Sequence, residues 1–271
     1  MPATPVDHST RGYLIPIGGA EKRKKSGTIH RRFVSLCGGD AARILVIPTA
    51  SQLNETGPAY MELFESMGAR AVCMPVETRD EAFSEKLVEK LEESTGIFIT
   101  GGNQLLLSTI LGRTPVARTI RRLNAEGVHV AGTSAGADIM SEHLIAGGRS
   151  GPSPRESGVE LAPGLGLTNR AIIDQHFSQR GRMGRLLSAL SFNPFICGMG
   201  IDENTAAFIA PDGDLEVVGR GTITIIDPSD LRHSSMSYVR KAEAITLLGL
   251  KLHILAAGSH FNLETREARM A

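Results

Sequence analysis

The sequence predicts an α/β protein with a mostly parallel sheet flanked by helices and an antiparallel extension toward the C-terminus. As far as residue 145, short β-branched apolar runs alternate with segments of helical periodicity, which is the pattern of parallel strands joined by crossover helices. Beyond residue 208, apolar segments follow one another without helical patterns between them, and Asp212-Gly213-Asp214 is a hairpin signal. We expect residues 1–271 to form one domain, with residues 1–11 as a disordered tail.

The elements follow in order from hydrophobic periodicity and from glycine and proline stops. Parallel strands are expected at residues 13–17, 43–48, 71–76, 96–100 and 128–133. Helices are expected at residues 28–36, 58–67, 80–93, 105–111, 116–124 and 135–145. A further buried strand is expected from residue 170, and antiparallel strands at residues 215–218, 222–226, 244–248 and 252–255.

Composition indicates a globular protein without a strongly charged partner. The 271 residues include 29 basic and 29 acidic side chains, so the formal net charge is zero, and neither nucleic acid nor a membrane surface is indicated. Cys37, Cys73 and Cys197 lie far apart in apolar segments and are interpreted as buried thiols of a reducing compartment. The N-terminus lacks an apolar core after a basic start, and no apolar run could span a bilayer. We therefore expect a cytoplasmic protein.

A serine between two glycines marks the candidate centre of the molecule. Ser134 lies in Gly132-Thr133-Ser134-Ala135-Gly136, where an apolar run gives way to helical periodicity. In α/β hydrolases a G-x-S-x-G pattern forms a nucleophile elbow, in which the serine takes a strained conformation that only small neighbours allow. The alternative is an ordinary strand-to-helix turn in a glycine-rich chain.

A second glycine-rich turn, Gly101-Gly102-Asn103-Gln104, follows the strand expected at residues 96–100. Parallel sheets bind ligands at the carboxyl ends of their strands, and a glycine leaves its N–H group accessible. If this turn abuts the elbow, the N–H groups of Gly102 and Ala135 form an oxyanion hole. The alternative is an ordinary turn that connects a strand to a helix.

Two regions after the elbow are interpreted from their composition. Asp138, Glu142 and His143 are expected on the polar face of the helix at residues 135–145. Residues 146–169 are polar and rich in glycine, proline and serine, which is typical of an irregular segment. Its position just after the elbow helix favours a lid or a pocket wall.

The densest run of reactive side chains begins at Asp174. Asp174, Gln175 and His176 are expected at the end of a buried strand, on the edge that carries Ser134. His176 is the candidate general base, because an imidazole held within hydrogen-bond reach can remove the serine proton. A structural histidine is the alternative.

Three arginines, Arg180, Arg182 and Arg185, follow at the start of a helix, where the helix dipole disfavours cations. This placement favours a dense anion in front of them, since guanidinium groups bind carboxylates in a bidentate manner. Surface arginines that cover an apolar helix are the alternative.

Two more charged stretches have alternative interpretations. Residues 196–208 are expected to form a strand that ends in Asp202 and Glu203; one of these could orient His176, and we prefer Glu203, although spacing hardly separates them. Lys22-Arg23-Lys24-Lys25 is either a solvated loop or part of a groove for an acidic ligand. The histidines show no metal-ligand spacing, so neither a metal nor a cofactor is expected.

Together these motifs resemble the cyanophycinase family over most of the chain. The likeness rests on Gly18-Gly19-Ala20-Glu21, Gly101-Gly102-Asn103-Gln104, Gly132-Thr133-Ser134-Ala135-Gly136-Ala137, the block at residues 174–186, and residues 200–206. The family consists of serine exopeptidases related to aspartyl dipeptidase (peptidase E), with a fold akin to the class I glutamine amidotransferases. It hydrolyses cyanophycin, a polyaspartate whose side-chain carboxyls carry arginine, and releases β-aspartyl-arginine dipeptides.

The resemblance implies roles for individual residues. Ser134 would be the nucleophile, His176 the base and Glu203 its orienting acid. The positions of the family that bind substrate fall on Gln104, Asp174, Gln175, Arg180, Arg182 and Arg185, with the register of Asn103 against Gln104 left open. The resemblance also implies cyanophycin as the substrate and a homodimer as the assembly.

Two other interpretations stay open at this point. A related serine peptidase acting on short aspartyl dipeptides would share the elbow, with less need of three arginines and a long wall segment. The other is a catalytically inactive binding module of the same fold, since no sequence pattern proves that Ser134, His176 and Glu203 meet in space.

Overall fold

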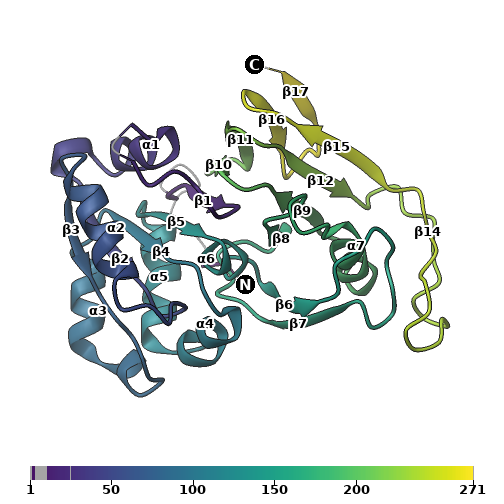
Figure 1. The fold of residues 1–271 in the computed structure, drawn as a ribbon, viewed down its shortest axis with the longest axis horizontal. Helices are drawn as coiled ribbons and strands as arrows, with labels where there is room; N and C mark the ends of the chain where they lie inside the picture. Colours follow the sequence, from purple (N-terminus) through teal and green to yellow (C-terminus); the bar gives the residue numbers. More distant parts are fainter. Residues whose placement is uncertain (1, 4–10, 25, 271) are drawn as a thin grey trace.

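A computed structural model describes residues 2–3, 11–24 and 26–270. It contains a large sheet covered by helices and a smaller sheet beside it, which carries one helix of its own (Figure 1). The tail expected at residues 1–11 falls largely outside the described residues. The interpretation of the chain as one domain stays a prediction.

The large sheet has nine strands in the order β17-β16-β11-β10-β1-β5-β4-β2-β3. Five neighbouring strands are parallel to one another: β1, β5, β4, β2 and β3. The sheet continues beyond β1 through antiparallel pairs with β10, β11, β16 and β17. Their bounds are β1 Leu14–Ile17, β2 Arg43–Ile47, β3 Arg70–Cys73, β4 Gly96–Ile99, β5 His129–Thr133, β10 Thr205–Ile209, β11 Asp214–Gly219, β16 Ser259–Asn262 and β17 Ala268–Met270. The parallel sheet predicted from the alternation of apolar runs is therefore present.

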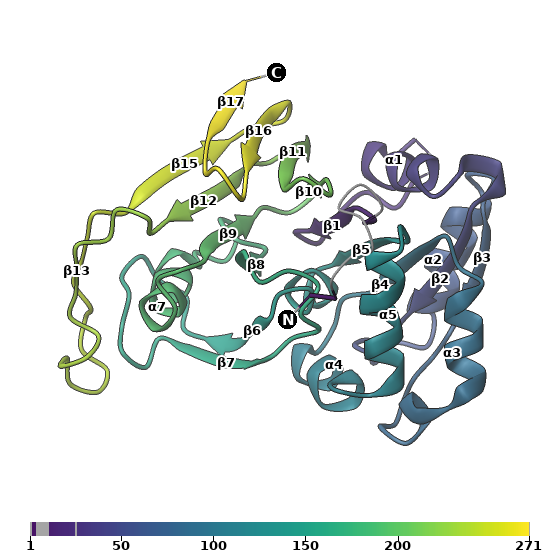
Figure 2. The same ribbon diagram turned by 180° about the vertical axis from the view of Figure 1, so that it is seen from behind.

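Helices cover both faces of this parallel part, as Figures 1 and 2 show from opposite sides. On one face, α1 (Thr28–Leu36) and α2 (Thr56–Glu65) pack aromatic side chains against β4. On the other face lie α3 (Glu85–Glu92), α4 (Gln104–Leu111), α5 (Pro115–Ala125) and α6 (Ala135–Asp138). The helix expected at residues 80–93 is divided, because a 3-10 turn at Glu81–Phe83 precedes α3. A second 3-10 turn spans Gly39–Ala41.

The smaller sheet has the strand order β15-β12-β9-β8. These strands are β8 (Ala171–Gln175), β9 (Cys197–Ile201), β12 (Ile223–Asp227) and β15 (Lys251–Leu255), and α7 (Met183–Phe192) packs on the sheet. The expectation that all C-terminal strands extend the main sheet is thus wrong for β12 and β15. The strand expected at residues 244–248 shrinks to β14 (Leu247–Leu248), paired with β13 (His233–Ser234).

The chain after the elbow differs from the expected helix at residues 135–145. α6 ends at Asp138, because the carbonyls of Ile139 and Met140 accept hydrogen bonds from the N–H groups of Leu165 and Leu167 at 2.7 and 2.8 Å. β6 (His143–Gly148) then pairs antiparallel with β7 (Val159–Pro163). The expected irregular segment, residues 146–169, therefore contains most of a β-ribbon, and its irregular parts are the connection between the two strands and residues 164–169.

The structure describes the state of the cysteines and the length and apolarity of the helices. The cysteines are free thiols, with Cys37 and Cys197 buried and Cys73 partly exposed; burial raises the pKa of the Cys197 thiol to about 11. Across residues 2–3, 11–24 and 26–270, no helix combines the length and apolarity needed to cross a membrane.

Candidate active site

Ser134 stands at the turn between β5 and α6 with φ 53° and ψ −117°. A non-glycine residue in this region is strained and persists only where its surroundings enforce it. The two flanking glycines allow the turn: a β-carbon on Gly132 would lie 2.2 Å from the carbonyl oxygen of Gly136, and one on Gly136 would lie 2.1 Å from that of Ile99. The local geometry is that of a nucleophile elbow.

His176 and Glu203 meet Ser134 from two strands of the smaller sheet. His176 follows β8 and Glu203 follows β9, so neighbouring parallel strands bring both side chains to one edge. The distance between Ser134 Oγ and His176 Nε2 is 3.1 Å, and that between His176 Nδ1 and Glu203 Oε1 is 2.6 Å. The three residues thus form a continuous chain of contacts of the kind that activates a serine hydroxyl.

The surroundings of His176 favour its neutral form. Burial lowers the pKa of the imidazole below its usual value, the hydrogen bond with Glu203 acts in the opposite direction, and the positive charge of Arg180 lowers the pKa further. A neutral ring whose Nδ1–H is held by the Glu203 carboxylate leaves Nε2 as a proton acceptor toward Ser134.

Asp202, the other acid considered for this position, faces away from the imidazole. Its carboxylate accepts hydrogen bonds from the N–H groups of Ser178 and Thr222, each at 3.0 Å, and from both hydroxyls. Burial would raise the pKa of Asp202, but these hydrogen bonds hold it below its usual value. The contact with His176 therefore belongs to Glu203.

The glycine turn after β4 abuts the elbow, as its sequence suggested. A β-carbon on Gly101 would lie 3.5 Å from Ser134 Oγ. Gly102 has φ 143°, and a β-carbon there would lie 1.9 Å from the carbonyl oxygen of Ala50, so both features demand glycine. Gly101 therefore contacts the serine, Gly102 follows it in the same turn, and Ala135 begins α6 directly after Ser134.

A buried amide network lies behind Ser134. Gln175 Oε1 lies 3.2 Å from Ser134 Oγ, and Gln175 Nε2 donates to Asp138 Oδ2 at 3.2 Å. Gln104 Nε2 donates to the same Asp138 oxygen at 2.7 Å and to the carbonyl of Ile145 at 3.2 Å. Asn103 instead caps α4 by accepting from the Leu105 N–H group. Of the two amides, Gln104 is the one that reaches the site.

Asp138 is the functional candidate that sequence reasoning missed. We expected it on the polar face of a helix, but its side chain is fully buried because the chain turns back after α6. Burial and repulsion from Asp174 raise the pKa of Asp138 well above its usual range, and Arg185 and the two amides offset this only in part. A single acid in the apolar run Ala135-Gly136-Ala137-Asp138-Ile139-Met140 was the available signal.

The arginines are arranged around an acid of the chain itself. Two nitrogens of Arg185 donate hydrogen bonds to the buried Asp174 carboxylate. Arg182 donates to the same carboxylate at 3.3 Å and to the carbonyl of Gln175 at 2.5 Å. Both arginines are buried, whereas Arg180 is exposed. The anion in front of Arg182 and Arg185 is therefore Asp174 in this structure, and a surface position for these two arginines is excluded.

Comparisons with known proteins identify the family. The profile of Peptidase family S51 matches residues 14–217. The chain is 42% identical over 261 residues to the cyanophycinase of Nostoc sp., a match that spans 95% of this chain and 88% of that protein. It is 41% identical over 260 residues to the cyanophycinase of Geminocystis herdmanii, with 95% and 96% covered.

The chain belongs to peptidase family S51. The resemblance to cyanophycinases inferred from the motifs is thereby confirmed, and the S51 membership makes the chain a peptidase.

Solved structures agree with the fold of this S51 peptidase. A peptidase from an acI-B1 actinobacterium superposes with a TM-score of 0.69 at 22% identity, covering 94% of this chain and 98% of that one. A putative peptidase E from Listeria monocytogenes gives 0.53 at 20% identity, covering 78% and 98%. At such identities the likeness concerns the fold, and it supports the predicted α/β class.

The S51 site contains no evident metal centre. Among the residues that the structure describes, no three histidine, cysteine or acidic side chains are grouped so that they could hold a metal ion. The expectation of a site without metal or cofactor stays a prediction.

Proposed function

We propose that this S51 peptidase is a serine exopeptidase that hydrolyses the polyaspartate backbone of cyanophycin and releases β-aspartyl-arginine dipeptides. The observation that carries the chemistry is the contact chain from Ser134 through His176 to Glu203, with links of 3.1 and 2.6 Å. The relatives of 40–42% identity over 95% or more of the chain are cyanophycinases, which supports the substrate.

The first half of the reaction forms an acyl-enzyme. Ser134 Oγ attacks the carbonyl carbon of an aspartyl residue in the polymer backbone while His176 Nε2 accepts the hydroxyl proton. Glu203 keeps the Nδ1–H of His176 in place and stabilises the imidazolium. Collapse of the tetrahedral intermediate breaks the C–N bond, and His176 returns the proton to the leaving amine.

The second half releases the product. Water adds to the ester carbon while His176 again accepts a proton, and Ser134 leaves with that proton. In both halves the N–H groups of Gly102 and Ala135 stabilise the oxyanion, a role supported by the place of Ala135 directly after Ser134 and by the contact of Gly101, which precedes Gly102, with Ser134.

We assign the substrate-binding residues to two groups. Two residues contact the substrate directly. The amide oxygen of Gln175 lies 3.2 Å from Ser134 Oγ, and the exposed Arg180 binds a carboxylate of the substrate. Gln104, Asp174, Arg182 and Arg185 hold these contacts from behind, since they bind one another or Asp138. Asp138, which Gln104 binds, accepts from Gln175 Nε2 at 3.2 Å and so orients the Gln175 amide.

The assembly and the location that the sequence suggested remain predictions. A homodimer is expected from the resemblance, and light scattering coupled to gel filtration measures it directly. A cytoplasmic location is expected from the free cysteines.

Incubation of the purified protein with insoluble cyanophycin granules tests the function. We expect the granules to dissolve and mass spectrometry to find an aspartate–arginine dipeptide, with no dissolution by Ser134→Ala. Hydrolysis of free aspartyl dipeptides with the polymer intact would select the dipeptidase interpretation. Intact polymer and intact dipeptides, beside an active control enzyme, would select the binding module.

A further inference from the structure

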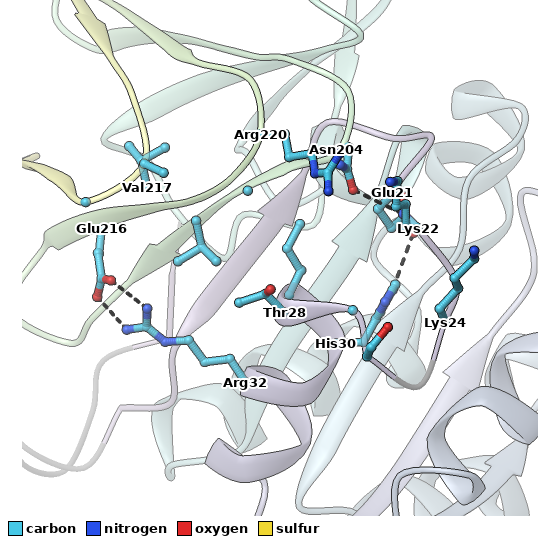
Figure 3. A pocket seen from close by; sticks show the side chains of 17 residues that line it. Glu21, Lys22, Lys24, Thr28, His30, Arg32, Asn204, Glu216, Val217 and Arg220 are labelled. Atoms are coloured by element: carbon cyan, nitrogen blue, oxygen red, sulfur yellow. Dashed lines mark hydrogen bonds and ion pairs between the residues drawn. The ribbon is translucent and has the colours of Figure 1, made fainter.

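A cavity of about 650 Å³ opens between the start of α1 and the end of β11, outside the catalytic contacts (Figure 3). Its floor includes residues 26–30 at the beginning of α1, and its rim includes Lys22, Lys24 and Arg220. On one side, Arg32 forms two hydrogen bonds with Glu216 at 2.7 and 2.5 Å, which fixes that wall (Figure 3).

The charges around this cavity are unbalanced. Lys22, Lys24 and Arg220 are exposed, and within the described part of the chain none of them forms an ion pair. The acids of the lining are already engaged, because Glu216 binds Arg32 and Glu21 accepts from Tyr60 and Thr133 at 2.6 Å each. The rim is therefore locally positive in a chain whose formal net charge is zero.

The floor also offers hydrogen-bond donors. α1 begins without a side-chain cap at Gly27, so first-turn N–H groups remain for a ligand or water. The buried ring of His30 lines the cavity, and neither ring nitrogen has a hydrogen-bond partner among the described residues. Its Nε2 lies 3.6 Å from Glu21 Oε1, a contact that becomes an ion pair when the ring is protonated. Cations and donors together suit a carboxylate ligand.

The cavity shares its walls with the catalytic centre. Asn204, directly after Glu203, lines it; its N–H donates to the Gly19 carbonyl at 2.8 Å, and its side chain accepts from the Lys22 N–H at 3.1 Å. The Arg220 N–H donates to the Asn204 carbonyl at 3.0 Å. A polymer chain that leaves the catalytic contacts past Asn204 therefore reaches the cavity directly.

We propose that this cavity is a second subsite that binds the free carboxylates of polymer units lying beyond the catalytic centre. The proposal rests on the proposed function: each arginine of cyanophycin is attached through its amino group, so its carboxylate stays free. Of the basic run, Lys22 and Lys24 face the ligand, whereas Arg23 lies over the Tyr60 ring at 5.5 Å and does not line the cavity. The subsite holds long chains on the enzyme between successive cleavages.

A charge-matched pair of variants tests the subsite. Lys22→Ala/Lys24→Ala/Arg220→Ala removes the rim cations, and Lys86→Ala/Lys90→Ala/Arg118→Ala removes three cations from α3 and α5 on the opposite face of the sheet. With soluble long polymer, we expect KM to rise about tenfold in the rim variant only, because this variant loses three ion contacts that are each weakened by solvent screening. With a two-unit oligomer, kcat and KM should stay unchanged in both, and high salt should shrink the difference.

Binding to the Ser134→Ala form separates this proposal from the proposed function. Polymer affinity that depends on the rim cations supports the subsite even if the wild type hydrolyses nothing, in which case only the function fails. Polymer affinity equal in both triple variants overturns the subsite, whatever the activity. Inorganic phosphate is the third probe: phosphate binding that needs the rim, beside polymer binding that does not, assigns the cavity to a free small anion and overturns the proposal.

Discussion

The imidazole of His176 occupies the space that a side chain on Gly19 would fill. A β-carbon at Gly19 would lie 2.4 Å from His176 Cε1 and 2.5 Å from Nε2, the atom that faces Ser134. Gly18 also accepts from the His176 N–H at 2.8 Å. The turn after β1 therefore sets the position of the His176 imidazole, although it contributes no reactive side chain.

Gly19→Ala should consequently damage catalysis more than folding. Displacing the ring by even about 1 Å can cost roughly a hundredfold in rate, so we expect kcat on polymer to fall by about that factor. Gly39→Ala is the matched control, since Gly39 also has positive φ, 61°, but no atom lies within 4 Å of its added β-carbon. A kcat for Gly19→Ala equal to that of Gly39→Ala would contradict the steric argument.

Glu203→Gln and Asp202→Asn should separate the two neighbouring acids. Glutamine cannot stabilise the imidazolium, so we expect Glu203→Gln to lower kcat by about 10²–10⁴-fold with little change in KM. Asp202→Asn weakens hydrogen bonds to Ser178 and Thr222 and should lower the melting temperature while leaving kcat within a few-fold. The reverse pattern would reassign the orienting acid.

The pH profile should report the depressed pKa of His176. The imidazole must be neutral to accept the serine proton, so kcat/KM falls as pH drops through its pKa, which burial places below the usual 6.5. Arg180→Gln removes a charge that lowers this pKa, and the acid limb should therefore move to higher pH. Arg122→Gln, a change on the exposed side of α5, should not move it; an acid limb above pH 6.5 in the wild type contradicts this account.

Local patterns were enough to predict the three side chains that contact one another at the elbow. Ser134, His176 and Glu203 each follow a strand whose apolar run is visible in the sequence, and parallel strands place their carboxyl ends on shared edges. The glycines at positions 101, 102, 132 and 136 mark backbone approaches that no other residue tolerates. These features depend on neighbours along the chain or on the sheet, so periodicity and spacing reveal them.

The features that the sequence did not reveal depend on contacts between segments that are far apart along the chain. The helix after Ser134 ends early because the N–H groups of Leu165 and Leu167 donate to the carbonyls of the two residues that follow it. No local propensity encodes that contact. The same turn buries Asp138. Likewise, nothing in the spacing of Arg182 and Arg185 shows that Asp174 already binds them.

Asp138 should act as a positioning residue for Gln175. Asp138→Ala frees both amides and should lower kcat/KM on polymer by about tenfold, the cost of one well-made buried hydrogen bond. Since burial raises the pKa of Asp138, the neutral Asp138→Asn keeps one acceptor oxygen and should retain activity within a few-fold. Steady-state kinetics of the pair decide: a loss in Asp138→Asn as large as that in Asp138→Ala contradicts the role of the acceptor oxygen, and no loss in either contradicts positioning.

Glu21 should make the protein acid-sensitive. Burial opposes ionisation, but contacts with His30, Thr133 and Tyr60 lower the pKa of Glu21 from 4.5 to about 2. A carboxyl with a lower pKa in the folded state stabilises the fold above the unfolded value of 4.5 and loses this contribution as pH falls toward 2, about 3 kcal/mol in all. Glu21→Gln should be less stable at pH 7 and lose less between pH 4.5 and 3 in urea unfolding. Parallel losses in the variant and the wild type would mean that other carboxylates govern acid unfolding.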